Sequence, residues 1–509
     1  MRSGARAGTR NRSLAAVAAL LLPLAVAAPA AADPTGDRSL GDRVGRAAEY
    51  LRQHMTDNRI PGLAYAIVRD DQVIGQNAWG VDGDGGSITP QTPFVLGSVS
   101  KSFTALAVMQ LVEAGRVELD APARRYVSWL RLADESVAAR ITVRQLLNHT
   151  SGLPDVVDRG LLDRFDNSPG GLTRTVRELA TVAPTVPPGE AYQYSNANYM
   201  VLGALVEAVA GQSFGSYLRR RVLDPLNMTH AVTDEVEART FGLPAGHRYY
   251  FGRPQRFDPP FDTAGLPHGY LAMSLDDLTH YAIAQLNDGR YGDASVLSPQ
   301  GIAQLHTGQV TTDGGGRYGL GWRESVLDGP GDHIVWHAGA TPHYFSHLLL
   351  IPESDLAVLV MSNVYGLSMD WPLASAAFNV ARIMQGGEAV PGAPDPVLNR
   401  LLLGLVVVGA LLLGLLIWTA VRILWRRRDR SRTARRRIIA GTAGWVVGCV
   451  ALAVGALRAL PAAFGGVGLA QAMLYATDLA HTLIVVAGLA VGTAVIRLGA
   501  AVHELTRRR

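Results

Sequence analysis

Lysine is almost absent from this chain of 509 residues. Of its 47 basic residues, 46 are arginine and one, Lys101, is lysine. This skew indicates that arginine fills the positions that need only a positive charge. Lysine differs from arginine in being able to lose its proton near physiological pH. Ser98 precedes Lys101 by three residues, a spacing that puts both side chains on one helix face. The pair is typical of a nucleophile with its base, although an isolated pair can also arise by chance.

Cysteine and C-terminal acidic residues are also scarce. The single cysteine, Cys449, lies in an apolar stretch, so no intramolecular disulfide can form. Residues 397–509 hold 15 arginines and only three acidic residues, a net charge of +12 in a chain whose total is +4. A basic segment can indicate nucleic acid. These arginines flank long apolar stretches, however, so we expect a lipid bilayer as the partner and no nucleic acid.

Residues 1–400 divide into a leader, a globular region and a linker. Residues 1–32 are predicted to be a signal peptide, because arginines precede the apolar run Leu14–Ala28 and three alanines follow at 30–32. The alternative is an uncleaved anchor. Residues 33–385 have the composition of a soluble domain. Residues 386–400 are expected to be a linker, since proline and glycine break both helix and strand.

Residues 401–509 are predicted to form three transmembrane helices, over Leu401–Leu424, 438–457 and 479–499. A buried helical hairpin is the alternative for the second and third. Three crossings place the arginine-rich loop 425–437 and the basic C-terminus on the same side. The positive-inside rule makes that side cytoplasmic and leaves the globular domain outside the cell membrane.

Within 33–385, hydrophobic periodicity predicts strands at both ends of the domain and a helical middle. The expected fold is therefore α+β, with a sheet completed by both ends. The expected helices are 41–57, an amphipathic one at 98–115, and 371–385; the expected strands are 62–69, 72–79, 334–336, 345–351 and 356–361.

Three short segments carry a family resemblance. They are Phe94–Thr104, which contains Ser98-Val99-Ser100-Lys101; Tyr194-Ser195-Asn196; and Trp336-His337-Ala338-Gly339-Ala340. Together they resemble the motifs of the serine β-lactamase and penicillin-binding superfamily. The resemblance is greatest to the class C β-lactamase and D-alanyl-D-alanine carboxypeptidase branch, which includes esterases. It implies an antiparallel sheet flanked by helices, with a mainly helical second lobe. Leu146–Leu153 resembles another family segment, interpreted as a structural loop.

The resemblance also implies site residues. Ser98 would be the nucleophile, and Lys101 and Tyr194 would transfer its proton. Which of the two is the base stays open, because they titrate as a coupled unit. The residues implied to position substrate are Asn196, His337 and Gly339, and the backbone N–H groups of Ser98 and Ala340 would form the oxyanion hole. The simpler alternatives are a helix N-cap for Ser98 and core packing for Tyr194.

His337 departs from the usual pattern, because relatives acting on β-lactams or D-Ala-D-Ala usually have lysine there. A mostly neutral histidine is a weaker anchor for a substrate carboxylate. A zinc site was considered because four histidines cluster in the sequence: His333, His337, His343 and His347. On strands and turns their side chains would diverge, and no Glu or Cys completes a site, so neither a metal nor a cofactor is predicted.

The sequence therefore predicts an extracytoplasmic, membrane-anchored serine hydrolase. Its substrate would be an ester, a D-amino-acid peptide of the kind found in cell walls, or a β-lactam. A second hypothesis is a sensor or binding module that is acylated, turns over little and signals through the membrane spans. A transporter component is a weaker third. Protein partners are not predicted.

Overall fold

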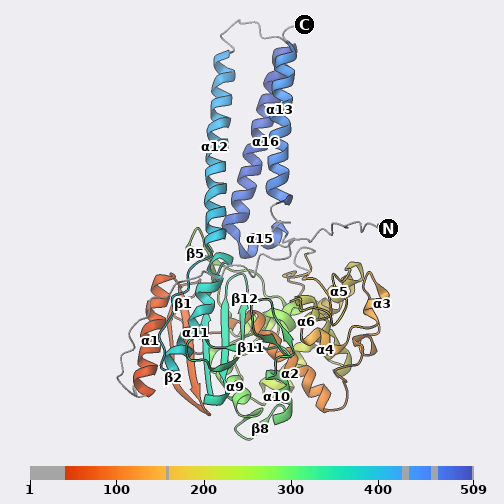
Figure 1. Cartoon of the computed structure of the whole chain (residues 1–509), viewed down its shortest axis with the longest axis vertical. Helices are drawn as coiled ribbons and strands as arrows, with labels where there is room; N and C mark the ends of the chain where they lie inside the picture. Colours follow the sequence, from red (N-terminus) through yellow and green to blue (C-terminus); the bar gives the residue numbers. More distant parts are fainter. Residues whose placement is uncertain (1–39, 156–159, 427–434, 460–467, 507–509) are drawn as a thin grey trace, which may run out of the picture. The chain divides into compact units, whose positions relative to one another are not determined.

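The computed structural model describes residues 40–155, 160–426, 435–459 and 468–506 (Figure 1). These residues form two compact units. One comprises Thr35–Leu403 together with Ala470–Leu479, and the other comprises Gly404–Leu469 and Ala480–Arg509. The predicted signal peptide and most of the predicted basic loop lie outside the described residues.

An eight-stranded antiparallel sheet forms the first layer of the larger unit. Its strand order is β2-β1-β14-β13-β12-β11-β10-β9, so strands from both ends of the domain meet in its middle. The bounds are β1 Gly62–Arg69, β2 Gln72–Gly80, β9 Val310–Thr311, β10 Arg317–Tyr318, β11 Arg323–Val326, β12 His333–Ala340, β13 Phe345–Ile351 and β14 Leu356–Ser362. The predicted strands are all confirmed.

Helices cover both faces of this sheet. Alternate residues of β13 and β14 belong to two separate hydrophobic clusters, as expected where successive side chains point to opposite faces. One cluster includes α1 (Leu40–Asp57) and α11 (Asp370–Met384), which pack together; the other includes α9 (Leu275–Leu286). Every residue of β13 and β14 is buried, which explains why both strands are apolar apart from Ser346, His347 and Ser362.

A helical lobe forms the second part of the unit, around α2 (Ser100–Glu113). The prediction of an amphipathic helix starting at Ser98 was wrong in two respects. A 3₁₀ turn, η1 (Gly97–Val99), precedes α2, and 11 of the 14 residues of α2 are buried. Contacts with several helices of the lobe and with α10 leave α2 little exposed surface. The other helices are α3 Glu135–Ala138, α4 Val143–Leu147, α5 Gly171–Glu178, α6 Asn196–Ala210, α7 Phe214–Leu218, α8 Glu235–Thr240 and α10 Pro299–His306.

Short elements connect the two layers. β3 (Phe94–Val95) pairs with β6 (Ala272–Met273), which ties the chain before η1 to the chain before α9. A π-helical turn, η7 (Leu266–Tyr270), lies just before β6 and contacts α2, α6 and η1. The remaining strands are β4 Gly246–Tyr250, β5 Arg253–Phe257, β7 Arg290–Tyr291, β8 Ala294–Ser295 and β15 Val364–Tyr365.

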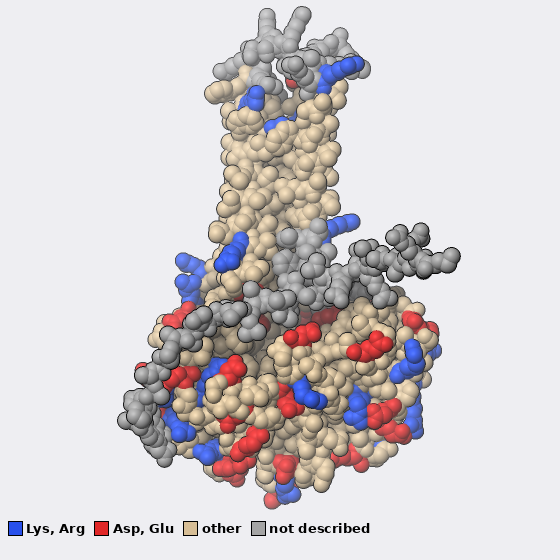
Figure 2. Space-filling model, in the orientation of Figure 1, with Lys and Arg blue, Asp and Glu red and all other residues tan. Residues whose placement is uncertain are grey.

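Three C-terminal helices are long and apolar enough to cross a membrane: α12 (Pro396–Arg426), α13 (Arg435–Val454) and α16 (Thr477–Thr506). α12 and α16 contain the first and third predicted spans, and α13 covers the second as far as Val454, where the π-helical turn η10 (Gly455–Ala459) continues it. On the face drawn in Figure 2, charged side chains of the second unit gather toward its ends. Because α12 begins at Pro396, the end of the predicted linker is helical. A short helix that was not predicted, α15 (Leu469–Tyr475), precedes α16.

Candidate active site

Two glycines bring the backbone of Ser98 against strand β12. Gly97 has φ +56°, a left-handed conformation, and a Cβ there would lie 2.3 Å from the amide nitrogen of Ala340. A Cβ on Gly339 would lie 2.5 Å from the amide nitrogen of Ser98 and 2.0 Å from the carbonyl oxygen of Leu96. Only glycine at both positions permits this approach. It brings together the two segments that carry the predicted oxyanion-hole donors.

Lys101 is fully buried in the first turn of α2, with every ammonium hydrogen engaged. Its Nζ donates to Ser98 Oγ at 2.9 Å, Asn196 Oδ1 at 2.7 Å and the carbonyl oxygen of His268 at 2.7 Å. Burial lowers the pKa of Lys101 to about 7, against an opposing effect of the Asp155 carboxylate. Burial is thus the largest cause of the shift.

The three partners of Lys101 define what it does when neutral. A neutral amine keeps two N–H donors and gains one lone pair. The carbonyl of His268 and the amide oxygen of Asn196 are acceptors only, so they retain the two N–H groups. The lone pair then faces Ser98, whose hydroxyl can both donate and accept. With a pKa of about 7, a large share of Lys101 is in this form at neutral pH.

Tyr194 is the second group on the nucleophile, and its hydroxyl donates to Ser98 Oγ at 2.9 Å. Burial raises the pKa of Tyr194 above its usual range, so the phenol keeps its proton at neutral pH. The arrangement therefore favours Lys101 as proton acceptor and Tyr194 as donor. Ser98 Oγ is thus hydrogen-bonded by both Lys101 and Tyr194. Ser98 is not the N-cap of α2, because that position is held by Val99.

The predicted structural loop supports Tyr194 through His149. The two rings lie 4.3 Å apart between centroids, and His149 is fully buried. Burial lowers the pKa of His149 well below its usual range, so the ring is neutral. Its Nδ1 accepts from the amide of Ser195 at 3.1 Å and from the side-chain amide of Asn198 at 3.0 Å. This loop therefore fixes the segment that carries Tyr194 and Asn196.

His337 is buried on β12 and has partners at both ring nitrogens. Nδ1 donates to the carbonyl oxygen of Ala338 at 2.7 Å, and Nε2 accepts from the hydroxyl of Tyr318 at 3.0 Å. Burial lowers the pKa of His337 well below its usual range, as does the charge of Arg323. A neutral histidine with both nitrogens engaged leaves no free N–H for a substrate carboxylate.

Arg323, on β11, is a residue of the site that sequence reasoning missed. Its guanidinium carbon lies 5.7 Å from the ring centroid of Tyr194, 5.5 Å from that of Tyr318 and 5.4 Å from that of Trp336. Its charge also lowers the pKa of Lys101. One arginine among 46, outside any motif, gave no signal in the sequence. Strand pairing between β11 and β12 places it opposite Trp336.

The four histidines considered for zinc have different surroundings. His333 pairs with Glu324 and Glu353, and His347 contacts the carbonyl oxygen of Ala374. In the part of the chain that the structure describes, no group of three His, Cys, Asp or Glu side chains is placed to hold a metal ion.

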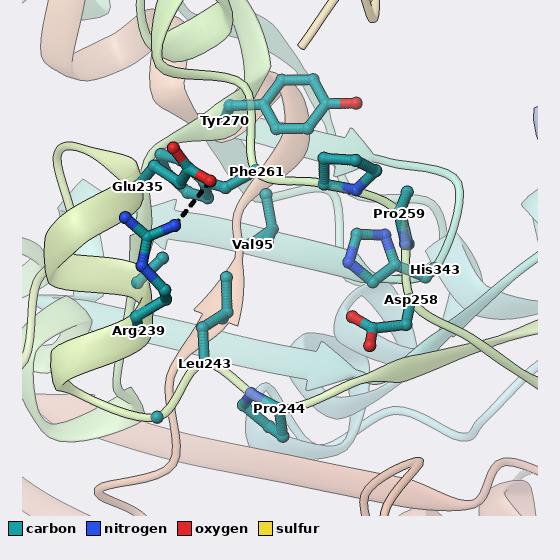
Figure 3. A pocket seen from close by; sticks show the side chains of 13 residues that line it. Val95, Glu235, Arg239, Leu243, Pro244, Asp258, Pro259, Phe261, Tyr270 and His343 are labelled. Carbon is teal, nitrogen blue, oxygen red and sulfur yellow. Dashed lines mark hydrogen bonds and ion pairs between the residues drawn. The ribbon is translucent and has the colours of Figure 1, made fainter. Parts of the chain in front are cut away.

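A hollow of about 360 Å³ lies apart from Ser98, Lys101 and Tyr194. Its wall includes Val95, Leu243 and Phe261, and Figure 3 shows the rings of Tyr270 and His343 beside it. Ser98, Lys101 and Tyr194 do not line it. We therefore assign it no part in the chemistry of Ser98.

Comparison with known sequences identifies relatives of the larger unit. The family profile described as Beta-lactamase matches residues 47–377. Penicillin-binding protein 4 of Amycolatopsis lactamdurans is 31% identical over 325 residues, covering 60% of this chain and 82% of that protein. Protein flp of Staphylococcus aureus (strain N315) is 26% identical over 325 residues. That match covers 62% of this chain and 62% of the length of Protein flp.

Solved structures give the same result for the fold. The octameric penicillin-binding protein homologue from Pyrococcus abyssi has 27% sequence identity and a TM-score of 0.60, covering 70% of this chain and 81% of that one. EstCE1, a hydrolase with promiscuous acyltransferase activity, has 22% identity and a TM-score of 0.56, covering 68% and 98%. The second likeness concerns the fold alone.

Proposed function

Because this chain belongs to the beta-lactamase family of serine hydrolases, we propose that it is a hydrolase that works through an acyl-enzyme on Ser98. The observation that carries the proposal is the hydrogen bonding of one hydroxyl, Ser98 Oγ, by both Lys101 and Tyr194 at 2.9 Å. A nucleophile held by a base and by a second proton carrier is the arrangement that acyl transfer requires.

In the proposed mechanism, neutral Lys101 takes the proton of Ser98 as Oγ attacks the carbonyl carbon of the substrate. The backbone N–H groups of Ser98 and Ala340 stabilise the oxyanion, which is usually worth about 10²–10³-fold in rate per donor. Tyr194 passes a proton to the leaving group, and Lys101 returns one through the shared network. Water then attacks the acyl-enzyme by the reverse route, with Asn196 holding the amine of Lys101 in place.

Arg323 gives the proposal a substrate class. His337 has no free N–H for a substrate carboxylate. We assign that role to the guanidinium of Arg323, which lies over the ring of Tyr194. Arginine binds carboxylates with two parallel N–H groups. We therefore place a peptide that ends in a D-amino acid with a free carboxylate first. Esters and β-lactams are the alternatives, and the class C and carboxypeptidase branch is the assignment within the family.

The location is also part of the proposal. Residues 1–32 would direct export. The three apolar helices would hold the chain in the cell membrane, with the larger unit outside. Substrates derived from the cell wall would be accessible there.

The test uses the full chain in detergent with three substrates: an acyl-D-Ala-D-Ala peptide, p-nitrophenyl acetate and a labelled penicillin. The mass of the protein and the release of product are followed together. Product release with any one substrate supports a hydrolase. A stable adduct without release supports the alternative, an acylated sensor. No adduct and no product with all three refutes the assignment of Ser98.

A matched pair of substrates tests Arg323. We expect kcat/KM for the acyl-D-Ala-D-Ala carboxylate to exceed that for its C-terminal amide, and Arg323→Gln to remove the difference while Arg323→Lys keeps part of it. Arg253→Gln, at an exposed arginine on β5, is the control and should keep the preference. Equal preference in wild type and Arg323→Gln would contradict this role.

A further inference from the structure

The segment that leads into the third apolar helix belongs to the larger unit. Residues Ala470–Leu479 are part of the same compact unit as Thr35–Leu403. The ring of Tyr475 lies edge-on to that of Tyr365, 6.0 Å between centroids. Arg248 donates to the carbonyl oxygen of Met473 at 3.4 Å, and the amide of Phe251 donates to Asp478 at 3.2 Å.

Two side chains of this segment end on one carboxylate, that of Asp163. Gln471 donates its side-chain amide to Oδ2, and the hydroxyl of Tyr475 donates to Oδ1 at 3.4 Å. The hydroxyl of Tyr270 donates to Oδ1 at 2.5 Å. All three donors are neutral. Burial raises the pKa of Asp163, while each of these hydrogen bonds lowers it.

Tyr270 connects this carboxylate to the active site. It is the last residue of the buried turn η7, which also contains His268. The carbonyl oxygen of His268 is one of the three acceptors around Lys101. The neighbouring carbonyl of Pro267 accepts from the hydroxyl of Thr104, one helical turn further along α2, at 2.7 Å. The turn is therefore fixed to α2 on one side and to Asp163 on the other.

We infer that Gln471 and Tyr475 are positioning residues of the active site. They hold Asp163, which holds the hydroxyl of Tyr270, and the turn that ends at Tyr270 presents the carbonyl of His268 to Lys101. The segment between two membrane helices thus completes the wall of a site whose Ser98 and Lys101 lie more than 300 positions away in sequence. This inference rests on the proposed role of Lys101 as the base.

The consequence concerns one hydrogen bond. If η7 shifts, the ammonium form of Lys101 loses an acceptor, and the neutral form becomes relatively more favourable. The acidic midpoint of kcat/KM should then move to lower pH, while the plateau falls because the amine is less well aimed. A hydrogen bond to a charged group is commonly worth a factor of about 10–100, which sets the expected loss.

The groups that act on Lys101 must stay the same for this comparison to hold. They are Asp155, Arg323, Tyr194, Tyr199, His149, His268 and His337, and the variants below change none of them.

The test compares Gln471→Leu and Tyr475→Phe in the full chain, in detergent, with Tyr249→Phe as the control. Tyr249 is a buried tyrosine whose hydroxyl donates to the carbonyl oxygen of Asn58, so its loss matches the loss of a buried hydroxyl. Hydrolysis of p-nitrophenyl acetate is measured from pH 5 to 9. The rate is divided by the concentration of sites that a fluorophosphonate probe can label.

We expect both variants to lose about 10-fold or more in plateau kcat/KM per labelled site, with a lower midpoint, and the control to keep both values. In an Asp163→Asn background, Gln471→Leu should cause no comparable further loss. An unchanged plateau and midpoint per labelled site, or a midpoint that rises, overturns the inference and leaves the proposed function intact. A wild-type chain that is not labelled at Ser98 overturns both.

Discussion

The pH dependence of acylation follows directly from the surroundings of Lys101. Its amine is fully buried among three hydrogen-bond acceptors, and burial lowers its pKa to about 7. Only the neutral amine can take the proton of Ser98. Lowering the pH below this pKa should therefore slow acylation, although the substrate and the nucleophile stay the same.

The size of the effect is set by the fraction of neutral amine. Half of the lysine is neutral at its pKa, and the fraction falls about tenfold for each further pH unit. Between pH 8 and pH 5 the second-order rate constant should therefore fall by about 100-fold. The assay is stopped-flow release of p-nitrophenol from p-nitrophenyl acetate under single-turnover conditions. Ser98→Ala supplies the background to be subtracted at every pH.

Two results would refute this reasoning. A rate constant that does not change between pH 5 and 8 would mean that no group with a pKa near 7 acts as the base. A midpoint near 10 would assign the limb to an ordinary lysine or to a phenol, because unperturbed lysine and tyrosine both titrate there. Either outcome would move the base away from buried Lys101.

Three other predictions test separate parts of the account. Lys101→Arg should fold yet acylate at least about 100-fold more slowly, since guanidinium keeps its proton; near-normal adduct formation by mass spectrometry would contradict this. Gly339→Ala should lower kcat by about 10²–10³-fold because a Cβ there meets the amide of Ser98, whereas Gly45→Ala, with open space around it, should leave kcat unchanged. Burial lowers the pKa of His268 and His343 to about 3, so the stability that they contribute as neutral rings is complete above pH 6.5 and is lost as the pH falls toward 3. At pH 4.5 these two rings should together account for about 5 kcal/mol of the fall in the free energy of unfolding in urea, and a free energy of unfolding that stays constant from pH 7 to 4.5 would contradict this.

Local sequence patterns predicted the sheet well. The strand Leu356–Ser362, for example, is apolar at every position as far as Met361 and follows turn residues, and burial on both faces is what such a run requires. The nucleophile segment was found because Lys101 stands out in composition and spacing. Signals of this kind depend only on residues close together in sequence, so they can be recognised without knowing how the rest of the chain folds.

Features set by long-range packing could not be predicted in the same way. The burial of α2 depends on helices and turns distant in sequence, so its periodicity gave the wrong picture of an exposed face. Arg323 enters the site through pairing of β11 with β12, and η7 through the pairing of β3 with β6. The hydrogen bond of Gln471 to Asp163 joins residues 308 positions apart. Neither Gln471 nor Asp163 belongs to a sequence motif that would have indicated this contact.

The central claim is that Ser98 carries a transient acyl group during turnover. The most direct test is peptide mapping by mass spectrometry of the full chain, quenched within the first turnover with acyl-D-Ala-D-Ala peptide, p-nitrophenyl acetate or penicillin. The account predicts an adduct of the acyl mass on the peptide that contains Ser98, absent in Ser98→Ala. Turnover without such an adduct, or an adduct on another residue in wild type, would contradict it.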